Sequence, residues 1–257
     1  MIELFETLAR RAGAAILAIR SEGFDTLEKA DASPVTRADR DAERIILEGL
    51  RGTMPDMPVV AEEEASAGLS PDAVGRRFIL VDPLDGTREF VKGGTDFTVN
   101  IAFVEDGVPV AGVVYAPALD ECYVGSAAGA FLNGKPIATS KSDTHLRIVA
   151  SKSHRTPETD AWIDAAVARF DRPLELVGIG SSLKFCILAR GEADLYPRLG
   201  RTMEWDTAAG DAVLRAAGGA TFAMDGEPLT YGKPPAPEIG EADAFANGHF
   251  YAMAKTA

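Results

Sequence analysis

The chain has 257 residues, 46% of them hydrophobic, which is enough for one large core or two small domains that share a face. Its formal net charge is −13, so its summed field repels nucleic acid polymers and anionic lipid. No apolar run approaches the ~20 residues that cross a bilayer, and the first residues lack the pattern of a secretory signal. We therefore expect a cytoplasmic protein without a transmembrane segment, and we leave open whether it associates peripherally with the inner face of the membrane.

The two cysteines, Cys122 and Cys186, are expected to be reduced. Cys186 lies in the apolar run Phe185–Leu188, which is typical of a packed thiol and not of a disulfide partner. Nothing in the sequence chooses between a monomer and a homodimer.

Residues 4–50 carry the pattern of two amphipathic helices. Apolar side chains recur at helical spacing from Leu4 to Ile19, and this first helix should end near Gly23. Thr36 followed three positions later by Asp39 is typical of a capping box, which predicts that a second helix begins there. Two helices therefore precede the predicted sheet.

Residues 78–137 favour an antiparallel meander. The segments 78–81, 98–104, 108–115 and 123–124 are rich in β-formers, and turn residues interrupt them at 105–107 and 133–134. Beyond residue 148 the chain alternates predicted helices (about 157–170, 182–190 and 206–217) with short strands (174–177, 193–196 and 220–223). The polar stretch at 139–143 predicts a division into an N-terminal part, 1–145, and a C-terminal α/β part, 146–257.

Residues 82–87, Asp-Pro-Leu-Asp-Gly-Thr, follow the predicted strand at 78–81. Pro83 fixes φ and Gly86 permits a backbone conformation that other residues avoid, so Asp82, Asp85 and the carbonyl of Leu84 can point to one spot. Hard oxygen donors of this kind suit Mg²⁺. Taken alone the motif is equally typical of a surface turn.

Two further acidic motifs lie far from this one in the sequence. Glu62, Glu63 and Glu64 follow a short predicted strand at 59–60, although three glutamates by themselves are more often a solvated loop. Asp206 is expected to open a helix of small residues, where an Asp is most often an N-cap. A carboxylate has two oxygens, so capping and metal binding are compatible.

Taken together, the three motifs resemble the lithium-sensitive, magnesium-dependent phosphatases of the inositol monophosphatase superfamily. The resemblance implies an α+β fold, a layered α/β/α/β/α sandwich with an antiparallel N-terminal sheet and a C-terminal mixed α/β part. It implies that two or three Mg²⁺ ions are held by Glu62, Asp82, the Leu84 carbonyl, Asp85 and Asp206. It also implies that Thr87 and Asp39 orient and deprotonate the attacking water, with Glu63 in support.

The spacing around these motifs is similar to the bacterial 3'(2'),5'-bisphosphate nucleotidase branch, which removes the 3'-phosphate of adenosine 3',5'-bisphosphate to give AMP. A second phosphate needs cations away from the metals. The positions that match the branch's nucleotide-binding residues are His154, Ser181, Lys184 and Arg198. Gly86, Thr87 and Asp206 are expected to contact the reacting phosphate end of the substrate.

Two alternatives remain open. The same metal site could serve inositol-1-phosphate, histidinol phosphate or another polyol phosphate. A protein that binds metals or partners without turnover is the second alternative, but such a protein should have lost a ligand or the water-activating hydroxyl, and none is missing.

Overall fold

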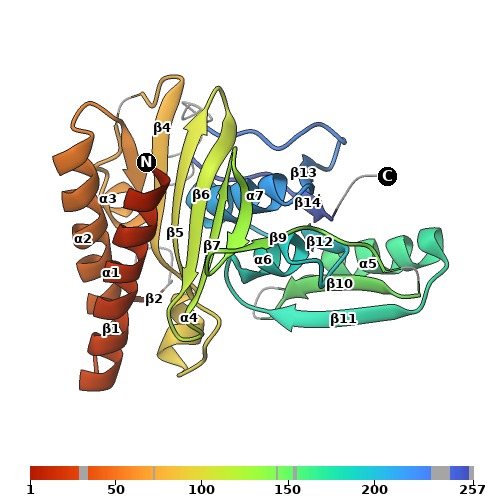
Figure 1. Ribbon diagram of the computed structural model, residues 1–257. Coiled ribbons are helices and arrows are strands. Elements are labelled where there is room, and N and C mark those ends of the chain that lie inside the picture. The colour runs from red at the N-terminus through yellow and green to blue at the C-terminus, as the bar shows by residue number, and fades with distance from the viewer. Residues whose placement is uncertain (29–33, 72, 143, 153–154, 233–243, 255–257) are drawn as a thin grey trace.

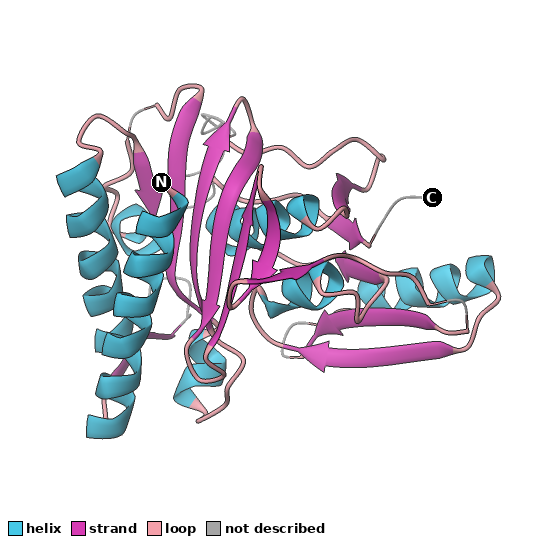
Figure 2. Ribbon diagram, viewed as in Figure 1, coloured by secondary structure: helices cyan, strands magenta, loops and turns pink. Residues whose placement is uncertain are grey.

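The computed structural model describes the chain except for residues 29–33, 72, 143, 153–154, 233–243 and 255–257. Two helices, α1 (Ile2–Glu22) and α2 (Arg37–Thr53), cover one face of a seven-stranded sheet (Figure 1). Helices α6 (Leu183–Ala189) and α7 (Glu204–Ala216) lie between that sheet and a five-stranded one. Helix α5 (Pro157–Phe170) packs on the outer face of the second sheet. The predicted five-layer α/β/α/β/α arrangement is therefore present (Figure 2).

The seven-stranded sheet is the predicted meander with one extra strand at its edge. Its strands follow chain order: β3 (Val59–Ala61), β4 (Arg77–Asp85), β5 (Thr98–Glu105), β6 (Val108–Ala116), β7 (Glu121–Ser126), β8 (Gly129–Leu132) and β9 (Lys135–Ile137). All pairs are antiparallel except β3 with β4. The predicted turns at 105–107 and 133–134 form with φ near +50° at Asp106 and Asn133, each followed by a glycine of positive φ.

The five-stranded sheet is mixed. Its order is β11-β10-β12-β14-β13, with β10 (Leu146–Ser151), β11 (Leu174–Ile179), β12 (Leu195–Arg198), β13 (Ala220–Ala223) and β14 (Phe250–Met253). β10 runs parallel to β11 and β12, whereas β14 runs antiparallel to both of its neighbours. A separate short hairpin joins β1 (Thr26–Glu28) to β2 (Pro34–Thr36) directly before α2.

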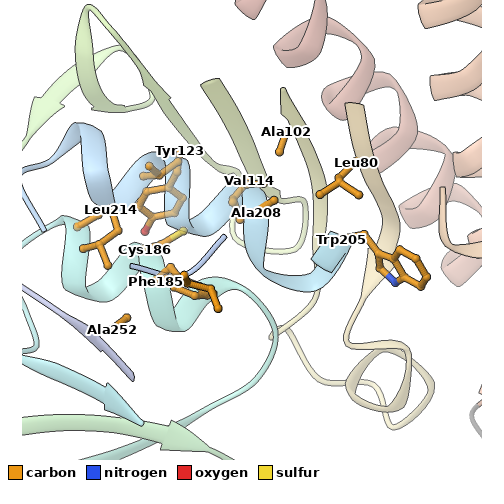
Figure 3. Close-up of a cluster of buried hydrophobic side chains, with 14 of the residues drawn as sticks. Leu80, Ala102, Val114, Tyr123, Phe185, Cys186, Trp205, Ala208, Leu214 and Ala252 are labelled. Carbon is orange, nitrogen blue, oxygen red and sulfur yellow. The ribbon is translucent and has the colours of Figure 1, made fainter. Parts of the chain in front are cut away.

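The largest core lies between the two sheets, around α6 and α7. Leu80 and Val114 of the first sheet meet Phe185 and Leu214 of the two helices there (Figure 3). A second core joins α1 and α2 to the other face of the same sheet, and both cysteines are buried and free. The division at residue 145 falls between β9 and β10 and stays a prediction, because the large core is built from both sides of it.

Two sequence-based details were wrong or incomplete. Helix α7 begins at Glu204 and not at Asp206, and strand β12 begins at Leu195 and not at residue 193. Within the described part of the chain, no helix combines the length and the apolarity needed to span a membrane.

A pair of glycines lets α7 lie directly on the seven-stranded sheet. Gly112 of β6 and Gly125 of β7 face each other across the ladder. A Cβ at Gly125 would lie 2.5 Å from the Cα of Val213, and one at Gly112 would lie 2.7 Å from the carbonyl oxygen of Ala209. Both obstacles are backbone atoms of α7, so no side-chain rotation could relieve the clash.

We predict that Gly125→Ala destabilises the fold by about 1–3 kcal/mol, because it pushes α7 away from the sheet. The free energy of unfolding in urea measures this. Gly178→Ala in β11 is the matched control, since its Cβ would meet nothing closer than the Cα of Lys152 at 3.9 Å. Equal stability of the two variants would contradict the close approach of α7.

Candidate active site

The acidic motif at 82–87 begins inside β4 and not in a turn after it, because the strand continues with a bulge to Asp85. The β4–β5 register shifts between Asp82 and Asp85, and the Asp82 carboxylate accepts a hydrogen bond from the Leu84 amide at 3.0 Å. Gly86 has φ +92°, and a Cβ there would lie 2.7 Å from the carbonyl oxygen of Asp96. Only glycine fits this position. The turn then leads directly into the short helix α4 (Thr87–Val91).

Thr87 connects this turn to α2. Its hydroxyl lies 3.0 Å from Oδ1 of Asp39 and 3.1 Å from the carbonyl oxygen of Leu84. The other carboxylate oxygen of Asp39 accepts hydrogen bonds from the amide and hydroxyl of Thr36, which completes the predicted capping box. Burial raises the pKa of Asp39, and the hydrogen bonds from Thr36 partly oppose that rise. The pairing of Thr87 with Asp39 that the sequence suggested is thus present.

The second acidic motif reaches the same place because β3 runs parallel to β4. The carboxyl ends of neighbouring parallel strands meet at one edge of a sheet, so Glu62 emerges beside the end of β4. Glu62 begins the short helix α3 (Glu62–Ser66). Buried Glu43 of α2 holds this helix start, accepting the amides of Glu63 at 2.8 Å and Glu64 at 2.9 Å.

Asp206 brings the third motif to the site from α7. It is the third residue of the helix and not its first, so the expected N-cap role is corrected. Its Oδ2 accepts the backbone amide of Met203 at 2.9 Å, which still satisfies one donor at the helix start.

The carboxylates of Glu62, Asp82, Asp85 and Asp206 therefore lie close enough to repel one another. Asp82 is buried and the other three are partly buried. Burial first, then the charges of Glu62, Asp85 and Asp206, raise the pKa of Asp82 far above its ordinary value. Burial and the neighbouring Asp85 raise the pKa of Asp206 to about 8. Glu62 also shares a side-chain hydrogen bond with Asp82. A cluster of this kind is stabilised when positive charge enters it.

These donors fit a hard divalent cation by their chemistry, since all are oxygens and most are carboxylates. Among the described residues, no three His, Cys, Asp or Glu side chains converge tightly enough to enclose an ion as they stand. Asp82, Asp85 and Asp206 each accept a hydrogen bond from the protein itself. Each has a second oxygen, so the set suits an ion that draws the carboxylates together.

Two buried cations lie next to this acidic cluster. Burial lowers the pKa of Lys184 to about 8, while the charge of Asp85 acts in the opposite direction. The Lys184 ammonium donates to the carbonyl oxygen of Ser181, and Ser181 has φ +49° at the start of α6. Arg198 donates to the carbonyl oxygen of Arg201 at 2.8 Å, whereas its buried Nε makes no hydrogen bond within the described chain.

Most of these groups line one cavity of about 1060 Å³. Its lining includes most of the predicted site residues: Glu62, Glu63, Asp85, Gly86, Thr87, Ser181, Lys184, Arg198 and Asp206. Asp82, Leu84 and Asp39 are buried behind the lining and reach it through their hydrogen bonds with Glu62 and Thr87. His154 lies outside the described residues, so its predicted role has no structural counterpart here.

The sequence reasoning missed three residues that hold the site together. Glu43 is one helical turn beyond Asp39, a spacing that could have placed it on the same helix face. Ser182 is adjacent to the selected Ser181, and Asn100 lies opposite Asp82 on β5. No sequence pattern marks Ser182 or Asn100, because their contacts join segments that are remote in the sequence.

A model of the inositol monophosphatase family matches residues 1–248. The chain belongs to this family. Two relatives carry the name 3'(2'),5'-bisphosphate nucleotidase CysQ. The one from Escherichia coli (strain K12) is 41% identical over 237 residues, covering 90% of this chain and 94% of the relative. The one from Buchnera aphidicola is 37% identical over 261 residues, covering 99% and 94%.

A solved structure of CysQ from Bacteroides thetaiotaomicron, described as a bacterial member of the inositol monophosphatase family, superposes with a TM-score of 0.81. It is 35% identical and covers 100% of this chain and 97% of its own. The predicted family and fold class are therefore confirmed.

We predict that the pH dependence of stability reports the buried carboxyl of Glu43. Burial raises its pKa to about 7 from 4.5. The unfolded chain therefore loses this proton first, and the contribution of Glu43 to stability falls as the pH rises from about 4.5 to 7. Glu43→Gln, which cannot ionise, should gain stability relative to the unmodified protein by up to roughly 3 kcal/mol across that range.

Urea unfolding at a series of pH values, in the presence of a chelator, measures this difference. Glu48→Gln on the same helix is the control, because Glu48 is an exposed partner of Arg44 and should show no comparable pH dependence. A pH-independent difference for Glu43→Gln would refute the prediction.

Proposed function

We propose that this chain removes the 3'-phosphate of adenosine 3',5'-bisphosphate, giving AMP and inorganic phosphate. The observation that carries the proposal is the side-by-side placement of the acidic cluster and the two buried cations, Lys184 and Arg198, in one cavity. A substrate with one phosphate to cleave and another to anchor needs both. The names of the relatives, bisphosphate nucleotidases at 41% and 37% identity, support the same substrate class.

We assign Glu62, Asp82, the Leu84 carbonyl, Asp85 and Asp206 to the binding of Mg²⁺, with two or three ions at once. When bound, these ions supply the positive charge that reduces repulsion between phosphate and nucleophile and eases the loss of a proton from water. Their presence would also relieve the mutual repulsion that raises the pKa of Asp82 and Asp206. Although the chain has a net charge of −13, the ions would make the cavity itself locally attractive to an anionic substrate.

Thr87 and Asp39 are proposed to move the proton of the attacking water. The Thr87 hydroxyl has one hydrogen, and it points to Asp39 or to the Leu84 carbonyl. A water in the cavity can donate to the Thr87 oxygen while Thr87 passes its own proton to Asp39. The raised pKa of Asp39 makes it a better proton acceptor than an ordinary aspartate. Glu63 supports the neighbouring Glu62 from the same helix start.

The remaining residues are proposed to hold the substrate. The backbone of Gly86 and Thr87 would contact the cleaved phosphate. Asp206, which lines the same cavity, would contact it as well. Ser181, Lys184 and Arg198 would hold the second phosphate, and Arg198 has a buried Nε available to donate. His154, which lies outside the described residues, is proposed to flank the ribose or base.

The rival substrates are inositol-1-phosphate, histidinol phosphate and other polyol phosphates. A solved inositol monophosphatase from Thermotoga maritima is 28% identical to this chain with a TM-score of 0.75, so the fold serves that substrate in a relative. A polyol monophosphate would leave Lys184 and Arg198 without a second anion, which is why we rank it lower. A protein without turnover is ranked lowest, since every described residue assigned to catalysis or metal binding lies in or directly behind the cavity lining.

A cytoplasmic location stays a prediction. Monomer and homodimer stay alternatives, and so does peripheral association with the inner face of the membrane.

The substrate assignment predicts a strong preference for adenosine 3',5'-bisphosphate over inositol-1-phosphate when initial rates are compared at equal Mg²⁺. Lys184→Gln should raise KM for the bisphosphate at least tenfold, because a buried charged hydrogen bond to the second phosphate is lost. It should leave KM for a monophosphate nearly unchanged. Lys135→Gln, at an exposed position on β9, is the control. Preference for the inositol ester would defeat the assignment.

The proton path predicts that Thr87→Val lowers kcat by about 10²–10⁴-fold, since valine keeps the shape of threonine and removes only the hydroxyl. Mg²⁺ affinity, measured by calorimetry, should stay within a few-fold of the unmodified protein. Asp85→Asn is the contrasting variant, because it should weaken Mg²⁺ binding as well as turnover. Undiminished kcat in Thr87→Val would exclude its hydroxyl from the proton path.

A further inference from the structure

We propose that Ser182 is a positioning residue that fixes the carboxylate of Asp85 for cation binding, and that Asn100 in turn fixes Ser182. The inference rests on the proposed function, because it concerns the same metal site. It assigns a role to two residues that the sequence motifs did not select.

Ser182 is the point where three separate segments meet. Its hydroxyl lies 2.9 Å from Oδ2 of Asp85 at the end of β4, and 2.5 Å from the backbone carbonyl oxygen of Asp206 in α7. The side-chain amide of Asn100 on β5 donates to the same hydroxyl at 2.9 Å. The backbone amide of Ser182 also donates to Asp85. Both Ser182 and Asn100 are buried, with exposed fractions of 2% and 1%.

The direction of these bonds follows from counting protons. The Asn100 amide nitrogen can only donate, so it occupies a lone pair of the Ser182 oxygen. The single hydroxyl proton of Ser182 is then left for Asp85 or for the Asp206 carbonyl. A bond to an ionised carboxylate is about twice as strong as one between neutral groups. The hydroxyl therefore donates to Asp85 whenever Asp85 is charged, which is the state that binds a cation.

The consequence is a fixed orientation for Asp85. Its Oδ2 is held from the α6 side by Ser182, so the carboxylate cannot rotate freely and keeps its remaining lone pairs for an ion in the cavity. Hydrogen bonds of this outer kind orient metal ligands, and their loss typically weakens metal affinity by 10–100-fold. The Asp206 carbonyl oxygen, 2.5 Å from the same hydroxyl, is the alternative acceptor of this single proton when Asp85 is uncharged.

A purely structural role would give a different result. In that case Ser182 would join the layers without affecting the metal, and its removal would lower the melting temperature alone. Thr98→Val is the matched control, because Thr98 is a fully buried neighbour on β5 whose hydroxyl makes no hydrogen bond within the described chain.

The experiment is calorimetric titration of Mg²⁺ into chelator-treated protein without nucleotide, together with the melting temperature. Ser182→Ala should bind Mg²⁺ about 10–100-fold more weakly than the unmodified protein. Its kcat should recover toward the normal value as Mg²⁺ is raised, while KM for the nucleotide at saturating Mg²⁺ should change little. Thr98→Val should keep its Mg²⁺ affinity. A lowered melting temperature with Mg²⁺ affinity within twofold of normal would overturn the proposal.

Asn100→Ala provides a second variant should Ser182→Ala not fold. It should weaken Mg²⁺ binding in the same direction but less, and the double variant should lose less affinity than the sum of the two, because both act through one oxygen of Asp85. Strict additivity would contradict the chain of bonds. If the unmodified protein bound no Mg²⁺, the proposed function itself would fail. Normal binding and hydrolysis with an unaffected Ser182→Ala would remove only this inference.

Discussion

The mutual repulsion of four carboxylates, one buried and three partly buried, is the constraint around which the rest of this structure is arranged. Burial and neighbouring charges, that of Glu62 among them, oppose the ionisation of Asp82, Asp85 and Asp206 and raise their pKa values. Such a cluster persists only where hydrogen-bond donors and positive charge surround it. The protein supplies backbone amides from Leu84 and Met203. The ammonium of Lys184 and the guanidinium of Arg198 add positive charge nearby. The charge balance is left open towards the cavity, where a cation and a phosphate can complete it.

Strand pairing and close helix packing bring these acidic residues together. The parallel pairing of β3 with β4 brings two acidic segments to one sheet edge, although the rest of that sheet is antiparallel. The glycines at 112 and 125 let α7 approach the same sheet closely and carry Asp206 with it. Helix α6 then lies against α7, and Lys184 within it and Ser181 just before it line the same cavity. Residues from both sheets, from α2 and from the α6–α7 layer line the cavity, so the site exists only when these layers are packed.

Hydrogen bonds from outside the acidic cluster hold two of the segments that form it. Glu43 holds the start of α3 from α2, and Ser182 holds the end of β4 from α6. Both are buried, and both connect elements that no local interaction would join. They limit the rotation of acidic side chains that would otherwise turn away from one another, which is why their effects should appear in metal affinity or in pH dependence as well as in stability.

Most of the elements and the acidic motifs could be predicted from the sequence, because these depend on local chemistry. The capping box of Thr36 and Asp39 and the turns at 105–107 and 133–134 involve neighbours in the chain and form as predicted, whereas residues 82–85, predicted as a turn, are the bulged end of strand β4. Only the tertiary structure decided the position of Asp206 within its helix, the parallel placement of β3, and the roles of Glu43, Asn100 and Ser182. These depend on contacts such as that of Asn100 with Ser182, 82 positions apart, whose partners are chosen by the packing of layers and not by neighbouring residues.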